Sequence, residues 1–224
     1  MTLKTFVTRL VAAWALTLGA TAQAVLIGGV EFPQGAASFA DAVISYSPGI
    51  VATGPTEPYR GAVNALGVPN YTGANSCASQ AACTFVSLGV GGSIVLQFVD
   101  NKLTGSDSAA DDLWIFEIGP DVEDTRVDIS KDGVTWSSVG AVTGSTRGVN
   151  IDAFGFSSAD IFAFVRLTDV AELDGTTGAT VGADIDAVGA ITTVLTPVPE
   201  PGTFALLGVG IAGLLLGTRA AGRR

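Results

Sequence analysis

Histidine is absent from the 224-residue chain, and cysteine occurs only twice. Without histidine the chain lacks the usual general base, the Ser-His-Asp arrangement and the commonest zinc ligand. The many serines therefore have no base that would activate one of them as a nucleophile. Two cysteine thiolates alone make an incomplete zinc site. The composition argues against nucleophilic hydrolysis and against zinc chemistry.

Basic residues are also scarce, with 11 Lys and Arg against 21 Asp and Glu. Several of the basic residues flank the two apolar ends of the chain, so residues 25–196 hold six basic side chains against twenty acidic ones. A surface of this charge repels phosphate backbones, which makes nucleic acid a poor partner. The same charge suits calcium binding or plain solubility.

The N-terminus has the three parts of a secretory signal. Lys4 and Arg9 provide a positive start, an apolar run covers residues 10–18, and Ala22 and Ala24 place small residues where signal peptidase reads the chain. The apolar run is too short to span a bilayer comfortably, which favours cleavage over a retained anchor. We therefore interpret residues 1–24 as a signal peptide that signal peptidase removes.

The C-terminus carries Pro199, Glu200 and Pro201, then an apolar run, then a short arginine-containing end. Two prolines so close together cannot lie inside a helix, so they mark a break in the chain. The apolar run predicts one hydrophobic helix at about residues 203–218, short for a bilayer core of about 30 Å. The arginines belong on the cytoplasmic side, which places residues 25–196 outside.

This ordered tail, over residues 197–224, resembles the PEP-CTERM sorting signal of Gram-negative bacteria that make exopolysaccharide. The resemblance implies an exosortase that cleaves near the Pro-Glu-Pro motif. It also implies a transient stay in the inner membrane, then delivery to the cell surface, the outer envelope or an extracellular matrix such as a biofilm. The alternative is an ordinary tail anchor that spans the membrane once.

Residues 25–196 are long enough for one domain with its own core. No long amphipathic helix is evident, and Gly, Asp, Ser and Thr interrupt short β-branched or aromatic runs about every eight to twelve residues. This pattern predicts an all-β sandwich, with a tight turn at residues 131–133. The expected strands are residues 41–46, 93–99, 113–118, 126–130, 135–139, 162–168 and 185–192.

Six short sequence segments occur in this order in the region: ALGVPN (65–70), VSLGVGGSIVL (86–96), DLWIFE (112–117), VDISKDGVTW (127–136), VRLTD (165–169) and GADIDAVGAI (182–191). In this order they resemble the galactose-binding-like (discoidin-related) jelly-roll superfamily. The resemblance implies a jelly-roll β-sandwich that binds sugars or other surface ligands, and commonly a structural calcium ion.

Acidic residues gather at the ends of the expected strands, and calcium takes six to eight oxygen ligands. Asp184 and Asp186 are two positions apart on a strand and so are expected on one face. Glu117 projects from an apolar strip, and a buried carboxylate needs a partner or a metal. Together with Asp112 they are the predicted calcium ligands. The alternatives are solvated loop carboxylates, or the paired carboxylates of a glycoside hydrolase, although no spacing singles out an acid and a base.

Tyr71 and Trp136 are the aromatic residues that we expect to contact a sugar, because Tyr71 lies in a loop and Trp136 follows a turn. Trp114 lies mid-strand in an apolar run and is expected in the core. In an oxidising compartment Cys77 and Cys83 are expected to form a disulfide across a short loop.

These observations predict an exported, non-catalytic module that binds exopolysaccharide or another surface glycan. The alternative is a purely structural matrix protein with no specific ligand.

Overall fold

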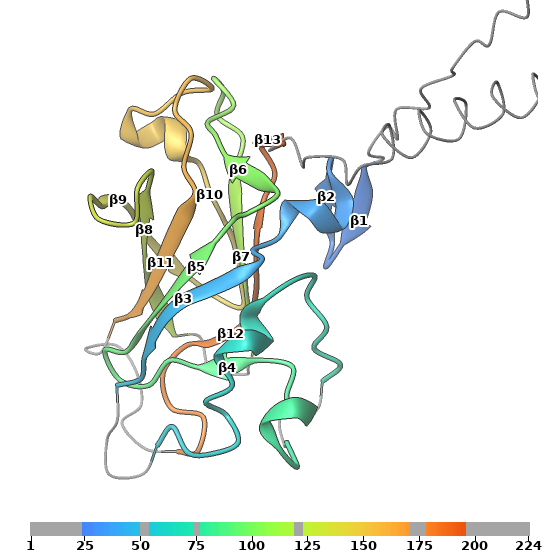
Figure 1. Cartoon of the computed structure of the whole chain (residues 1–224), viewed down its shortest axis with the longest axis vertical. Coiled ribbons are helices and arrows are strands. Elements are labelled where there is room, and N and C mark those ends of the chain that lie inside the picture. The colour runs from blue at the N-terminus through green and yellow to red at the C-terminus, as the bar shows by residue number, and fades with distance from the viewer. Residues whose placement is uncertain (1–23, 50–53, 74–76, 119–122, 171–177, 196–224) are drawn as a thin grey trace, which may run out of the picture.

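The computed structural model describes residues 24–49, 54–73, 77–118, 123–170 and 178–195, and these form a β-sandwich (Figure 1). Most of the predicted signal peptide, with Ala22, lies outside the described residues, and so do the Pro-Glu-Pro motif and the predicted tail helix. Within the described part, no helix has the length and apolarity needed to cross a membrane. The helices of this part are four short 3-10 helices: η1 (Gly35–Ser38), η2 (Ala62–Ala65), η3 (Gln80–Ala82) and η4 (Ile151–Phe154).

Two antiparallel sheets make up the sandwich. The four-stranded sheet has the order β10 (Thr146–Val149), β7 (Leu113–Glu117), β12 (Asp184–Ala190), β4 (Val86–Ser87). The five-stranded sheet has the order β3 (Ala42–Ser47), β5 (Ser93–Gln97), β11 (Phe164–Asp169), β8 (Asp124–Ser130), β9 (Ser137–Thr143). Two further pairs are β1 (Val25–Ile27) with β2 (Val30–Phe32), and β6 (Asn101–Leu103) with β13 (Thr193–Leu195).

The main core lies between the two sheets. Alternate residues of β5 and β8, such as Ile94, Leu96, Val127 and Ile129, are completely buried there. Side chains alternate between the faces of a strand, so such a pattern fills one face and leaves the other for polar residues. The prediction of an all-β sandwich is confirmed.

A second apolar cluster covers the outer face of the four-stranded sheet. Phe32 and Phe39, whose ring centroids are 4.6 Å apart, pack with Phe116 of β7. Trp114 is half-buried against the same cluster. Strands β7 and β12 are therefore covered on both faces, which explains why β7 is apolar on both faces except at Glu117.

Each of the seven expected strands is present, with bounds that differ by up to a few residues. The expected turn joins β8 to β9, and Gly133 adopts a φ of 75° there. Glycine reaches this left-handed conformation without the steric cost that other residues incur.

Cys77 and Cys83 are joined by a disulfide that spans a sequence separation of 6. So short a loop loses little chain entropy on closure, so the bond holds local shape more than global stability. Replacing both cysteines by serine is expected to lower the free energy of unfolding by about 2–3 kcal/mol or less. Urea denaturation of the double variant measures this, and a loss much larger than that would show that the bond supports the core itself.

Candidate functional site

A pocket of about 390 Å³ opens where the β1–β2 turn, residues 69–71 and the β9–β10 turn meet the end of β7. We call it the Tyr71 pocket. Three residues predicted from the sequence as site residues, Tyr71, Glu117 and Asp186, lie in its wall. The full lining is Gly28, Pro69, Tyr71, Phe116, Glu117, Ile118, Ser145, Thr146 and Asp186.

Asp186 holds the loop that presents Tyr71. The residue lies at an irregularity of β12, where the register against β7 shifts between Ile185 and Ala187. Its carboxylate oxygens each accept the N–H of Asn70 at 3.1 Å, and Oδ2 also accepts the N–H of Tyr71 at 3.1 Å. Burial raises the pKa of Asp186, and the two N–H groups offset part of that rise. The loop at 69–71 is therefore fastened to a central strand.

Glu117 is the unusual group of this pocket. It ends β7 and is 3% exposed, and the side chain and backbone of Glu123 act on its carboxyl group through hydrogen bonds. Burial raises the pKa of Glu117 to about 10, and the neighbouring Glu123 carboxyl and the charge of Asp184 add to the rise. At neutral pH the side chain is therefore an uncharged acid, with one O–H donor and an accepting oxygen.

Asp184 has a different partner from Asp186, although only one residue separates them. Its Oδ1 accepts the hydroxyl of Ser87 on β4 at 2.5 Å, and it is not part of the pocket lining. Burial raises the pKa of Asp184 to about 8. The shift in register interrupts the regular alternation on which the shared face of Asp184 and Asp186 was predicted.

Asp112 does not belong with the other three predicted calcium ligands. It precedes β7 whereas Glu117 ends it, and a rise of about 3.3 Å per residue puts their Cα atoms roughly 16 Å apart. Calcium ligands must lie within about 2.6 Å of one ion, so the two carboxylates cannot share it. Asp112 is fully buried and accepts the N–H of Ile151 at 3.0 Å and the hydroxyl of Thr192 at 2.8 Å. Its role is structural.

No group of three or more His, Cys, Asp or Glu that could hold a metal occurs among the described residues. Calcium binding remains a prediction from the sequence, with Glu117, Asp184 and Asp186 as the acidic residues that the fold leaves near one end of β7 and β12.

Trp136 lies away from the Tyr71 pocket, at the start of β9. The guanidinium carbon of Arg166 is 4.6 Å from the centre of its ring, and Arg166 in turn forms a salt bridge of 2.9 Å with Asp128. The half-buried indole therefore covers an ion pair of the five-stranded sheet. The structure does not bring Trp136 and Tyr71 to one site.

Sequence reasoning missed several lining residues, among them Gly28, Phe116, Ser145 and Thr146. The turn at Gly28 could have been predicted, because paired glycines between two short apolar runs are typical of a hairpin turn. Its φ is 57°, and a Cβ at this position would collide with the ring of Phe116. Ser145 is placed by its carbonyl, which accepts the N–H of Glu117 at 2.6 Å. That contact joins segments far apart in the sequence.

Residues 197–224 match the PEP-CTERM protein-sorting motif. The match confirms the predicted sorting motif. The PEP-CTERM motif implies an exported protein that is anchored transiently in the membrane and sorted by an exosortase to the cell surface.

Three solved structures show similarity to the chain. One, titled CpGH89CBM32-6 and produced by Clostridium perfringens, is 12% identical with a TM-score of 0.32, over 48% of this chain and 74% of that one. The C-terminal domain of a chitobiase from Bacteroides fragilis is 13% identical with a TM-score of 0.37, over 71% and 96%. A structure titled glycoside hydrolase is 13% identical with a TM-score of 0.33, over 67% and 30%. These similarities are too distant to assign a ligand. No curated protein sequence matches the chain.

Proposed function

We propose that this exported, exosortase-sorted protein binds a surface or matrix glycan in the Tyr71 pocket without catalysing a reaction. The observation that carries the proposal is the pairing, in one pocket, of a half-buried aromatic ring with a buried, protonated carboxyl group. A pocket of about 390 Å³ falls within the usual range for small-molecule sites.

The pocket has an apolar wall and a polar wall, which match the C–H face and the hydroxyl groups of a sugar ring. Tyr71 and Phe116 offer apolar ring surface to the C–H groups of a sugar. Glu117 offers a donor and an acceptor, and Ser145 and Thr146 add hydroxyl groups to the same wall. A ligand hydroxyl that hydrogen-bonds to Glu117 would add to the free energy of binding.

The chemistry of the carboxyl groups favours binding over hydrolysis. A general acid works best with a pKa near the operating pH, whereas the pKa of Glu117 is raised to about 10. The carboxylate of Asp186 is already occupied by two backbone N–H groups. The pair therefore lacks the separate acid and base, or acid and nucleophile, that glycoside hydrolysis uses.

The proposal predicts that Tyr71→Ala lowers affinity for the bound glycan at least about tenfold, because it removes the aromatic wall of the pocket. Glu117→Gln keeps a similar shape and is expected to weaken binding less. The measurement is a glycan array followed by titration of the purified chain with each oligosaccharide that binds. Trp136→Ala is the matched control, since it removes an aromatic residue outside the pocket.

Three outcomes would contradict the proposal. Equal loss of affinity with Trp136→Ala and Tyr71→Ala would show that the pocket is not the site. Release of reducing ends that Glu117→Gln abolishes would make the protein a glycoside hydrolase. Absence of binding to any glycan, with or without calcium, would leave a purely structural matrix protein.

A further inference from the structure

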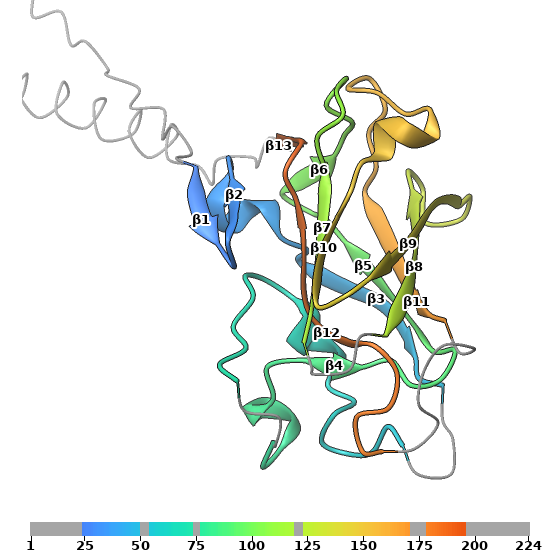
Figure 2. The same ribbon diagram turned by 180° about the vertical axis from the view of Figure 1, so that it is seen from behind.

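A second pocket, of about 400 Å³, opens at another end of the sandwich, between the β8–β9 turn and the segment that links η4 to β11. We call it the Phe156 pocket. Figure 2 shows the β8–β9 turn and η4 together, away from the β1–β2 hairpin that borders the Tyr71 pocket. The two pockets share no lining residue.

The floor of the Phe156 pocket is apolar and aromatic. The rings of Phe156 and Phe162 meet edge to face, with centroids 5.0 Å apart. Phe162 is buried and Phe156 is half-buried, so Phe156 supplies the ring surface that a ligand would reach. Ile129 of β8 completes this floor.

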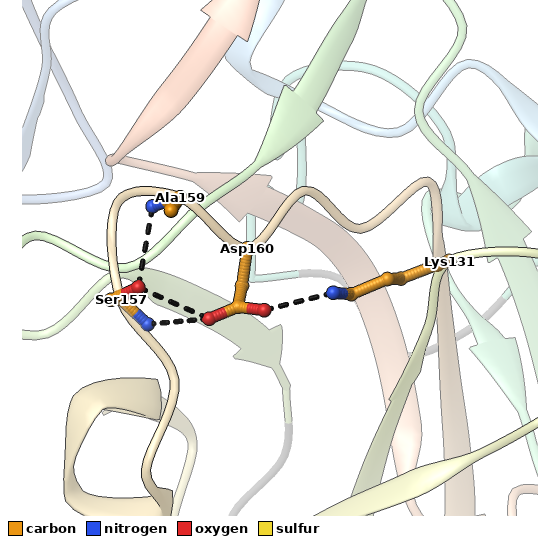
Figure 3. Close-up of polar contacts among 4 residues, drawn as sticks. All are labelled: Lys131, Ser157, Ala159 and Asp160. Carbon is orange, nitrogen blue, oxygen red and sulfur yellow. Dashed lines mark hydrogen bonds and ion pairs between the residues drawn. The ribbon is translucent and has the colours of Figure 1, made fainter.

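Lys131 lines the pocket, and Figure 3 shows its contact with Asp160 and the contacts of Asp160 with Ser157. The Nζ of Lys131 donates to Oδ1 of Asp160 at 2.8 Å and lies 5.3 Å from the centre of the Phe162 ring. The other oxygen of Asp160 accepts the N–H and the hydroxyl of Ser157, each at 3.1 Å. An ammonium group has three donors, so Lys131 keeps capacity beyond this ion pair. Thr135 and Ser137 add hydroxyl groups to the pocket.

Among the described residues, the rim carries no free positive charge. Asp160 neutralises Lys131, and the carboxylate of Asp132 accepts the N–H groups of Val134 and Thr135, each at 2.8 Å. An anionic ligand therefore gains no unpaired positive charge here and meets the carboxylate of Asp132. An aromatic floor below fixed donors and acceptors instead matches the apolar face and the hydroxyl edge of an uncharged sugar ring.

We propose that the Phe156 pocket is a second glycan site, which takes an uncharged pyranose unit, and that the protein therefore cross-links polysaccharide strands. The cross-linking rests on the proposed function of the Tyr71 pocket, because it needs both sites to bind glycan. Two sites on one rigid sandwich raise the effective concentration of the second contact, so a repetitive polymer is held far more tightly than a single sugar.

Titration of the full chain in detergent micelles tests the proposal. The neutral probes are tetrasaccharides of chitin, galactan, mannan and dextran, and alginate is the acidic probe. We expect two equivalents of at least one neutral probe per chain. Lys131→Gln and Phe156→Ala are each expected to remove one equivalent, and Tyr71→Ala the other. Lys131 has an exposed side chain, so its variant keeps the fold even if Phe156→Ala loses stability. Phe154→Ala is the matched control, since Phe154 lies on the neighbouring segment, is 48% exposed and does not line the pocket.

The outcomes separate the two proposals. One equivalent that Tyr71→Ala abolishes and Lys131→Gln leaves intact overturns the second site but supports the proposed function. One equivalent that only the Phe156-pocket variants abolish overturns the Tyr71 pocket and the cross-linking with it. No binding by any probe overturns both proposals, and a second equivalent of alginate overturns the assignment to uncharged sugars. The final test uses the long polysaccharide that corresponds to an oligosaccharide that binds. The wild type should cross-link this polymer and raise the turbidity of the solution, whereas each single-site variant should not.

Discussion

As the pH rises from 5 to 10, the free energy of unfolding is expected to fall steeply. Burial raises the pKa of Asp184 from 3.8 to about 8 and that of Glu117 from 4.5 to about 10. Between about pH 5 and 8, Asp184 and Glu117 therefore each keep a proton in the folded protein that they have released in the unfolded chain. Each such proton lowers the free energy of unfolding by about 1.4 kcal/mol per pH unit. This stability is fully present below about pH 4 and is lost as the pH rises through 8 for Asp184 and 10 for Glu117.

Carboxyl groups with lowered pKa values act in a different range. Hydrogen bonds lower the pKa values of Asp132, Asp152 and Asp160, so the stability they contribute is present above pH 4 and is lost only in stronger acid. The loss between pH 8 and 10 is therefore assigned to Glu117.

Urea denaturation at one-unit steps from pH 5 to 10 measures this dependence. Glu117→Gln is expected to flatten the curve between pH 8 and 10, whereas Glu31→Gln, at an exposed position of β2, should leave it unchanged. A wild-type curve that is flat over this range would contradict the buried, protonated state of both groups. A parallel series tests calcium, which would displace the protons and oppose the alkaline loss. Identical curves in calcium and in chelator would contradict the calcium prediction.

Replacing Pro199, Glu200 and Pro201 together by alanine is expected to abolish processing while export continues. The apolar run that follows is expected to suffice for membrane insertion, whereas the Pro-Glu-Pro motif is expected to be the sequence that the protease recognises. The variant should accumulate in the inner membrane at its uncleaved mass. Cell fractionation with mass spectrometry of the intact protein measures this.

Pro197→Ala is the matched control for the sorting experiment, because it removes a neighbouring proline and keeps the Pro-Glu-Pro motif intact. It should be processed as the wild type is. Normal cleavage and surface delivery of the triple alanine variant would refute the role of the motif.

The strands of the sandwich could be predicted because their signals are local. Val127 and Ile129 alternate with polar residues, β5 is a β-branched and apolar run between serine and glutamine, and glycine marks the turn at 131–133. The three-residue strands β1 and β2 gave too short a pattern to recognise. The order of strands in each sheet could not be read from the sequence, since β12 pairs with both β7 and β4 across long separations.

The candidate site was predictable as single residues but not as a group. Tyr71 and Asp186 were each identified by residue type, yet their contact spans a sequence separation of 115. The separation of Asp112 from Glu117 was open to prediction, because five positions along an extended strand already exceed the size of one ion site.

The anchor of the 69–71 loop has a consequence for how this protein can diversify. Asp186 holds position 71 through the backbone N–H, which almost every residue type possesses. The side chain at position 71 can therefore change while the loop keeps its attachment to β12. Related sequences, or a designed library, can vary recognition at this position without rebuilding the scaffold. Under the proposed function, a saturation library at position 71 should yield variants with shifted glycan preferences that keep the fold, although each loses the edge-to-face contact of the Tyr71 ring with Phe85.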